Sequence, residues 1–321
     1  MPFKDLGLAP SLVTTLDHHK LIEPTPIQLA AIPPILKRKD VLGIAPTGSG
    51  KTASYILPIL SYLVKNDQYK NRHIRALVIV PTRELAVQVL EFVHLFTTAL
   101  PRRIKSTAIY GGVSVNPQMI GLQHVELLIA TPGRLIDLLD RGALSLSDVS
   151  ILVMDEADQL LNAGFKKELD QIIHLLPVRR QNLLFSATLS PDVHNIQHLL
   201  LTDPLIIDIS PVEKTPVAID HQAYLTTDER KGPFLRYLIK KQGTDQALVF
   251  CSSINKTDKV AHKLYKNGVM ATAIHGNLSQ RARSIALSQF KSKKFQVLVT
   301  TDLLARGIDI EQMPYVINYE L

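Results

Sequence analysis

From residue 40 onward, short apolar runs alternate with longer segments whose apolar residues recur every three or four positions. The short runs are rich in Val, Ile and Leu, which is typical of parallel strands buried on both faces; they lie at residues 41–44, 76–80, 127–130, 151–154 and 183–185. The longer segments have the period of amphipathic helices, most clearly at residues 51–64, 83–96 and 165–176. This alternation predicts an α/β fold, with a parallel sheet covered by helices on both faces.

The alternation stops after Ile207. The segment that follows contains Pro211 and Pro216 and keeps neither period, so we predict a linker at residues 209–217. The alternation then restarts, and the predicted elements lie at residues 247–251, 258–266, 270–274, 279–290, 297–300 and 315–318. We therefore expect two α/β lobes in tandem, at residues 30–208 and 218–321.

Composition excludes several classes of protein. Apolar residues make up 46% of the 321 residues and charged residues 20%, which is enough core material for two folded domains and excludes a disordered chain. The single cysteine, Cys251, excludes an internal disulfide. No apolar run approaches the ~18 residues of a membrane helix, and the first residues have no signal-peptide core. We expect a cytoplasmic protein.

The net charge of +7 lies mainly in the last third of the chain. From Pro211 onward there are 16 basic and 10 acidic residues. Such an excess suits contact with a phosphate backbone. Many solvated protein surfaces are equally basic, so charge alone leaves both interpretations open.

A phosphate-binding loop is the strongest local signal. It lies between a predicted buried strand and a predicted helix, where backbone N–H groups turned by Gly48 and Gly50 can meet phosphate oxygens. Lys51 would reach the β- and γ-phosphates, and the Thr52 hydroxyl would hold Mg²⁺. The alternative is a glycine-rich turn without a ligand. The loop residues are Ala45, Pro46, Thr47, Gly48, Ser49, Gly50, Lys51 and Thr52.

Two carboxylates follow the predicted strand at residues 151–154. In open α/β sheets, ligands bind at the carboxyl ends of the strands. Asp155 would hold Mg²⁺ and Glu156 would deprotonate the attacking water, so that these two residues and Lys51 are the candidate catalytic set. The alternative is a solvated acidic helix start.

In one-letter code, Asp155-Glu156-Ala157-Asp158 reads DEAD, the motif after which the DEAD-box RNA helicases are named. The chain resembles this family of superfamily 2, whose members are built from two RecA-like P-loop NTPase lobes. The opening segment is most similar to the RhlE-type branch. The other family motifs occur in order: Pro24-Thr25-Pro26-Ile27-Gln28, Pro81-Thr82-Arg83-Glu84-Leu85, Gly111-Gly112, Thr131-Pro132-Gly133-Arg134, Ser186-Ala187-Thr188, His275-Gly276 with Gln280 and Arg283, Thr301-Asp302, and Ala305-Arg306-Gly307-Ile308-Asp309.

The resemblance implies that residues 1–29 form a Q-motif region that recognises ATP. The Gln28 amide offers a donor and an acceptor that match adenine N7 and its amino group. Phe3 would stack on the base, or else anchor the N-terminus in the core. Asp309 would accept a hydrogen bond from an ATP ribose hydroxyl, or else belong to a structural turn.

The resemblance also implies contacts with RNA. Arginine side chains can fork onto phosphate oxygens, threonine hydroxyls can donate to them, and Gly112 permits close approach of a backbone, unless it is only a turn glycine. Such contacts do not read sequence. The RNA-binding set is Arg83, Gly112, Thr131, Arg134, Arg283 and Thr301; the set that couples the lobes is Asp158, Ser186, Thr188 and Arg306. His275 and Cys251 are given no function.

The family's second lobe continues with a His-Arg-Ile-Gly-Arg-x-Gly-Arg segment, and this chain ends at Leu321 before it. We therefore expect an incomplete second lobe of lower stability and slow ATP turnover. The leading hypothesis is an ATP-dependent RNA helicase that binds single-stranded RNA and separates duplex RNA locally by ATP-driven lobe closure. The alternatives are an ATP-sensitive RNA-binding clamp with little turnover and a DNA-directed helicase.

Overall fold

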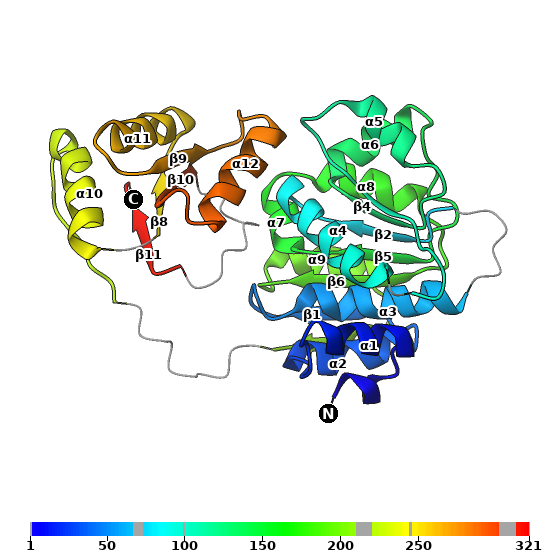
Figure 1. Cartoon of the computed structure of the whole chain (residues 1–321). Coiled ribbons are helices and arrows are strands. Elements are labelled where there is room, and N and C mark those ends of the chain that lie inside the picture. The colour runs from blue at the N-terminus through cyan, green and yellow to red at the C-terminus, as the bar shows by residue number, and fades with distance from the viewer. Residues whose placement is uncertain are drawn as a thin grey trace. The chain divides into compact units, whose positions relative to one another are not determined.

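The computed structural model describes residues 2–66, 73–98, 100–209, 220–243, 246–301 and 313–320. The chain divides into two compact units, Met1–Thr215 and Pro216–Leu321 (Figure 1). Of the predicted linker, only residue 209 falls within the described part of the chain. No helix in the described ranges is long and apolar enough to cross a membrane.

The first unit is built on a parallel sheet in the order β3-β4-β2-β5-β6-β1-β7. Its strands are β1 (Val41–Ile44), β2 (Ala76–Ile79), β3 (Ser106–Ile109), β4 (Leu127–Ala130), β5 (Ile151–Met154), β6 (Gln181–Ser186) and β7 (Leu205–Asp208). The predicted α/β fold class is thereby confirmed. The two edge strands, β3 and β7, were not predicted: β3 lacks a continuous apolar run, and β7 has a run of only three apolar residues, of which two are exposed.

Helices cover both faces of this sheet. They are the 3₁₀ helix η1 (Phe3–Leu6), α1 (Pro10–His18), α2 (Pro26–Leu36), α3 (Lys51–Lys65), α4 (Arg83–Thr97), α5 (Val115–Gly121), α6 (Pro132–Asp140), α7 (Ala157–Asn162), α8 (Lys166–Leu175) and α9 (Pro191–Leu200). In one core cluster, η1 and the four helices α1–α4 pack against one face of the sheet. In the other cluster, the four helices α6–α9 pack against the opposite face. The predicted Q-motif region therefore packs into the core of the first unit.

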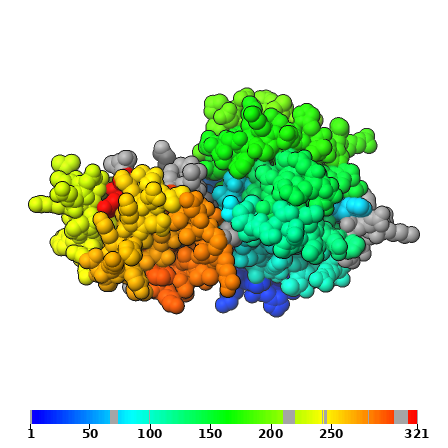
Figure 2. All heavy atoms as spheres, turned by 90° about the horizontal axis from the view of Figure 1, so that it is seen from above, coloured from blue at the N-terminus to red at the C-terminus, as the bar shows by residue number. Residues whose placement is uncertain are grey.

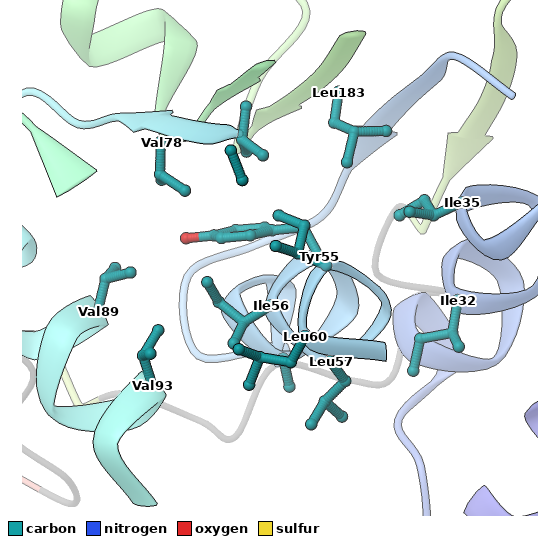
Figure 3. Close-up of a cluster of buried hydrophobic side chains, with 14 of the residues drawn as sticks. Ile32, Ile35, Tyr55, Ile56, Leu57, Leu60, Val78, Val89, Val93 and Leu183 are labelled. Carbon is teal, nitrogen blue, oxygen red and sulfur yellow. The ribbon is translucent and has the colours of Figure 1, made fainter. Parts of the chain in front are cut away.

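Helix α3 is the centre of the first core cluster. Figure 3 shows α3 between α2 and α4, with Ile56 and Leu60 pointing toward Val89 and Val93 of α4. Tyr55 lies on the side of α3 that faces the strands, and its side chain is fully buried. Because α3 begins at the end of the phosphate loop, this packing fixes the loop relative to the sheet.

The second unit has a smaller parallel sheet in the order β11-β8-β10-β9. Its elements are α10 (Asp228–Gln242), β8 (Ala247–Cys251), α11 (Ile254–Lys266), β9 (Ala271–Ile274), α12 (Gln280–Lys291), β10 (Val297–Thr301) and β11 (Tyr315–Asn318). Helices α10 and α11 contribute to the larger of its two core clusters, and Phe290 of α12 belongs to the smaller one. Figure 2 shows the end of the chain, in red, at the surface beside α10.

Candidate active site

The phosphate loop joins the carboxyl end of β1 to the start of α3 (Figure 1). Gly48 and Gly50 both have left-handed backbone angles, with φ of 77° and 94°. A Cβ atom at Gly50 would lie 2.3 Å from Nε2 of Gln28, so a side chain at this position would displace Gln28. The N–H of Ala45 donates to the carbonyl of Ser186 at 3.1 Å, which ties the start of the loop to β6.

Lys51 is the first residue of α3 and is only 7% exposed. Its ammonium Nζ donates to the carbonyl of Ala45 at 2.6 Å. An ammonium group has three donors, so two remain for phosphate oxygens. The buried hydroxyl of Ser49 has no hydrogen-bond partner among the described residues. An unpartnered donor in a glycine turn at a helix N-terminus fits a bound phosphate.

Gln28 connects α2 to the phosphate loop. Its Oε1 accepts from the N–H of Thr25 at 2.9 Å, and its Nε2 donates to the carbonyl of Gly50 at 3.2 Å. These two bonds fix the amide and leave one N–H and one lone pair unused. The remaining groups are the donor and acceptor that recognition of adenine needs, and this role stays a prediction.

Phe3 packs in the first core cluster and is 5% exposed. This is the arrangement of an aromatic anchor, the alternative that the sequence left open. A ring covered to this extent offers little of its face to a base, because the apolar side chains of its own cluster already contact it. Stacking of Phe3 on adenine stays a prediction.

Asp155 lies at the end of β5 and is 2% exposed. Its Oδ2 accepts from the hydroxyl of Tyr55 at 2.7 Å, and its Oδ1 accepts from the N–H of Glu156 at 2.9 Å. Burial raises the pKa of the Asp155 carboxyl above its ordinary value. Burial, and then the charge of Asp155, raise the pKa of the Tyr55 phenol well above its usual value, so the phenol keeps its proton and donates it to this bond.

Tyr55 is a site residue that sequence reasoning missed. Helix α3 places it four residues after Lys51, which brings both side chains to one face of the helix. The signal in the sequence is therefore a phenol one helical turn after the phosphate-loop lysine. Its hydrogen-bond partner, Asp155, follows β5 and is 100 residues away in the chain.

Glu156 has a left-handed backbone conformation, with φ of 50°, just before α7. Burial, together with the neighbouring Asp155, raises the pKa of its carboxyl to about 7. A carboxylate with a pKa near neutrality is well suited to take a proton from water. Strained backbone angles in residues other than glycine are concentrated at functional sites. Both features support the predicted role of Glu156 as a base.

Asp158 belongs to a hydrogen-bonded group that extends to the end of β6. Its Oδ2 accepts from the hydroxyl of Thr188 at 3.0 Å. The Ser186 hydroxyl donates to the carbonyl of Thr188 at 2.7 Å. Strand β6 lies between β1 and β5, so this group follows the strand between the phosphate loop and Asp155. The three residues are thus brought together within the first unit; their effect on the second unit stays a prediction.

Three of the predicted RNA-binding residues of the first unit converge on the loop after β3. Gly112 has φ of 77°, and a Cβ atom there would lie 1.8 Å from Nη1 of Arg83. Arg134 donates from Nη2 to the carbonyl of Val113 at 2.9 Å, and within the described part of the chain its buried Nη1 has no hydrogen-bond partner. Arg83 and Arg134 therefore both lie against this loop. Thr131, which precedes α6, is 7% exposed.

In the second unit, Arg283 on α12 is 4% exposed, and Thr301 ends β10. His275 follows β9, and its Nε2 lies 2.9 Å from Oδ1 of Asp258 on α11. Burial raises the pKa of the Cys251 thiol to about 11, so this thiol is unreactive at neutral pH. The predicted roles of Arg306 and Asp309 concern residues outside the described part of the chain.

Two family models match the chain. Residues 25–196 match the model described as DEAD/DEAH box helicase, and residues 230–321 match the helicase conserved C-terminal domain. The predicted bounds of the two lobes, residues 30–208 and 218–321, stay a prediction. The branch within the family is not distinguished by these models, so the similarity to the RhlE type stays a prediction.

Curated relatives agree with this result. The chain is 38% identical over its whole length to the ATP-dependent RNA helicase CshA of Limosilactobacillus reuteri, of which it spans 64%. It is also 38% identical to the DEAD-box ATP-dependent RNA helicase CshA of Geobacillus kaustophilus, matching 99% of this chain and 67% of that protein. The chain thus spans about two thirds of the length of these relatives.

Two solved structures are similar in fold. A DEAD box protein from Methanococcus jannaschii matches with a TM-score of 0.61 and 33% identity, covering 100% of this chain and 85% of that one. Dbp5 of S. cerevisiae, bound to RNA and ADP BeF3, matches with a TM-score of 0.83 and 27% identity, covering 99% of this chain and 80% of Dbp5. Together with the motifs and the site geometry, these matches show that the chain belongs to the DEAD/DEAH box helicase family.

Proposed function

We propose that this protein is an ATP-dependent RNA helicase that binds single-stranded RNA and locally separates duplex RNA. One observation carries the proposal. The phosphate loop with its two left-handed glycines follows β1, and Asp155 and Glu156 follow β5, at the same edge of one parallel sheet. Relatives that match the chain over nearly its whole length are named RNA helicases, and the Dbp5 structure contains RNA. We place its activity in the cytoplasm.

The residues of the first unit fit ATP and Mg²⁺. Loop residues 45–52 would hold the phosphates, with the two remaining N–H donors of Lys51 on the β- and γ-phosphates. The Thr52 hydroxyl and the Asp155 carboxylate are oxygen ligands of the kind that Mg²⁺ prefers. When bound, Mg²⁺ would neutralise charge on the phosphate oxygens.

Glu156 would take the proton of the attacking water. A base must be ionised to act, and the pKa of about 7 means that Glu156 is largely ionised above neutral pH. The positive charge of Lys51 opposes the effect of burial and favours this ionised form. Tyr55 acts one step further away, because its hydroxyl holds one oxygen of Asp155 and so orients the other.

Gln28 would read the adenine of ATP with its unused N–H and lone pair. Guanine presents two acceptors at the matching positions, so this pairing would favour ATP over GTP. Phe3 and Asp309 would complete the nucleotide contacts through the base and the ribose.

RNA would be bound by its backbone and without sequence preference. Arg83 and Arg134 converge on the loop of Gly112, and the unpartnered Nη1 of Arg134 can donate to a phosphate oxygen. Thr131 in the first unit and Arg283 and Thr301 in the second would add further phosphate contacts. Asp158, Ser186, Thr188 and Arg306 would couple hydrolysis to closure of the two units.

Steady-state ATPase measurements with matched RNA and DNA oligonucleotides test this function. We expect RNA to raise the turnover and DNA of the same sequence to leave it at the basal rate. Lys51→Ala serves as the control for contaminating ATPase, because it removes the ammonium from the phosphate loop. Equal stimulation by both nucleic acids would contradict RNA selectivity, and binding of ATP and RNA without any turnover would indicate a clamp instead.

A further inference from the structure

A pocket of about 670 Å³ lies at the amino ends of β1, β6 and β7. It is lined by the turn between α2 and β1, by the segment from α8 to β6 and by the segment from α9 to β7. The phosphate loop follows the opposite end of β1, a strand of four residues that spans ~13 Å. A ligand in this pocket would leave the nucleotide site free.

Asp40 holds the three segments of the pocket together. Its Oδ1 accepts from the N–H of Asn182 at 2.8 Å, and its Oδ2 accepts from the N–H of Thr202 at 2.9 Å and from Nδ2 of Asn182 at 3.4 Å. Three donors therefore share the charge of this carboxylate. The pocket is a built feature of the fold, because its walls are tied to one another.

The positive charges of the pocket are not neutralised in this way. Arg38 donates only to neutral groups, Oε1 of Gln181 at 3.1 Å and the carbonyl of Ser150 at 2.8 Å. Arg180 likewise donates to Oδ1 of Asn182 at 2.8 Å and to the carbonyl of Pro177 at 2.6 Å. Within the described ranges, no ion pair includes either arginine or Lys39. Desolvation lowers the pKa of both guanidinium groups, and the charge of Asp40 opposes this effect only in part.

The rim of the pocket is apolar and exposed. Val178 is 97% exposed and Leu199 is 69% exposed, while Leu176 lies buried between the same walls. Exposed apolar side chains around a concave site are typical of surfaces that bind another protein. His174 is the one aromatic residue of the lining, and its Nδ1 lies 2.6 Å from the carbonyl of Asp170 on its own helix. A single imidazole is a smaller platform for successive bases than the several aromatic rings typical of single-strand binding sites.

We propose that this pocket docks an acidic linear segment of a partner protein that carries a bulky aliphatic side chain. The carboxylates of the segment would meet Lys39, Arg180 and Arg38, which outnumber the one other lining carboxylate, Asp203. The aliphatic side chain would pack between Val178 and Leu199. A free phosphate would use the cations but not the apolar rim, and a nucleic acid would find His174 as its one aromatic contact and leave the exposed aliphatic rim unused.

The test uses the whole chain and a fluorescein-labelled peptide of Asp and Glu with two leucines, followed by fluorescence anisotropy. We expect binding that weakens as the salt concentration rises. Lys39→Glu and Val178→Ser should each weaken peptide binding by at least about fivefold. Lys39→Glu reverses a charge of the pocket, and Val178→Ser replaces an apolar side chain of the rim with a polar one. Neither side chain makes a hydrogen bond or an ion pair with any residue that the structure describes, so both variants should fold. A peptide with serine in place of leucine should bind more weakly.

Matched controls separate this pocket from a general charge effect. Lys37→Glu changes an exposed lysine of the same turn that does not line the pocket, and Ile120→Ser changes an exposed aliphatic residue on α5. Both should bind the peptide like the wild type. If either control weakened binding as much as its partner variant, the docking site would be refuted. If a uridine oligonucleotide displaced the peptide and lost affinity in Lys39→Glu, the pocket would be a nucleic-acid site instead. ATP binding, measured in parallel, reports on the proposed nucleotide site separately.

Discussion

The two units share an alternation of strands and helices but bury their sheets to different degrees. In the first unit every residue of β1, β2, β4, β5 and β6 is buried. In the second unit, buried and partly exposed residues alternate in β8, and in β11 no residue is buried. A strand that is buried on both faces opens rarely because it is packed on both sides, and this packing also holds the residues that directly follow it in place. The predicted catalytic residues Lys51, Asp155 and Glu156 all follow such fully buried strands of the first unit.

Substitution of Glu156 tests the role of the first unit most directly. Glu156→Gln removes the base but keeps the size and shape of the side chain, so we expect turnover to fall by about 10²–10⁴-fold with ATP still bound. Lys51→Ala should abolish turnover and also weaken ATP binding, because the phosphate loop loses its ammonium. Single-turnover ATPase and nucleotide binding separate the two effects. Turnover of Glu156→Gln close to that of the wild type would show that another group takes the proton.

Hydrogen exchange tests the comparison of the two units themselves. Among the described residues the second unit has the smaller core, and one of its two clusters has three buried members, Ile274, Phe290 and Leu298. We expect amides of β8 and β9 to exchange at least about tenfold faster than those of β5 and β6, because opening free energies follow local packing. Mass spectrometry of peptides from the ligand-free chain measures this. Equal protection of the two sheets would mean that burial does not set their relative stability.

How much of this could be predicted from the sequence depends on how local each signal is. The continuous apolar runs of β1, β4 and β5 predicted these strands with their observed ends. Edge strand β3, Ser106–Ile109, was missed because its mixed composition follows its partial exposure. Helix α10 was missed because Gly232 and Pro233 interrupt it, and packing of Leu235 and Ile239 overrides their low helix propensity.

The site shows the same division. The phosphate loop is contiguous in the sequence, and its predicted residues lie together in the structure. The contact of Tyr55 with Asp155 and the passage of Arg83 over Gly112 each join segments that are far apart in the chain. Spacing in one sequence gives no distance between such residues, because the distance is set by strand order and by the packing of helices on the sheet.

Tyr55→Phe tests whether the core of the first unit positions its chemistry. The substitution keeps the packing of the ring shown in Figure 3 and removes only the hydroxyl that donates to Asp155 at 2.7 Å. A lost hydrogen bond to a buried charged group costs about 1.5–3 kcal/mol. We expect turnover to fall by about tenfold and the Mg²⁺ concentration for half-maximal activity to rise, since Asp155 loses its orientation.

Tyr62→Phe is the matched control for this variant. Tyr62 lies on the same helix, and its hydroxyl accepts from Ser150 at 3.3 Å, away from Asp155. We expect it to leave the Mg²⁺ dependence unchanged. A purely structural role of Tyr55 would lower the stability of the first unit without shifting the Mg²⁺ dependence, and that result would refute the positioning role.

The smallest expected effect is a pH dependence of stability in the ligand-free first unit. The pKa of Glu156 is about 7 in the folded chain, and the unfolded carboxyl has its ordinary value of 4.5. Between these two values the folded state binds more protons than the unfolded state, so stability falls as the pH rises through this window. Because Glu156 is only partly buried, we expect a loss of about 1–2 kcal/mol between pH 5 and 8.

Glu156→Gln should lack this loss, whereas Glu91→Gln, which changes an exposed carboxylate on α4, should retain it. Hydrogen exchange of β5 and β6 peptides across this pH range, corrected for the intrinsic exchange rate, reports on the first unit alone. If the wild type and Glu156→Gln showed the same pH dependence, the loss of stability between pH 5 and 8 would have to come from the titration of another group.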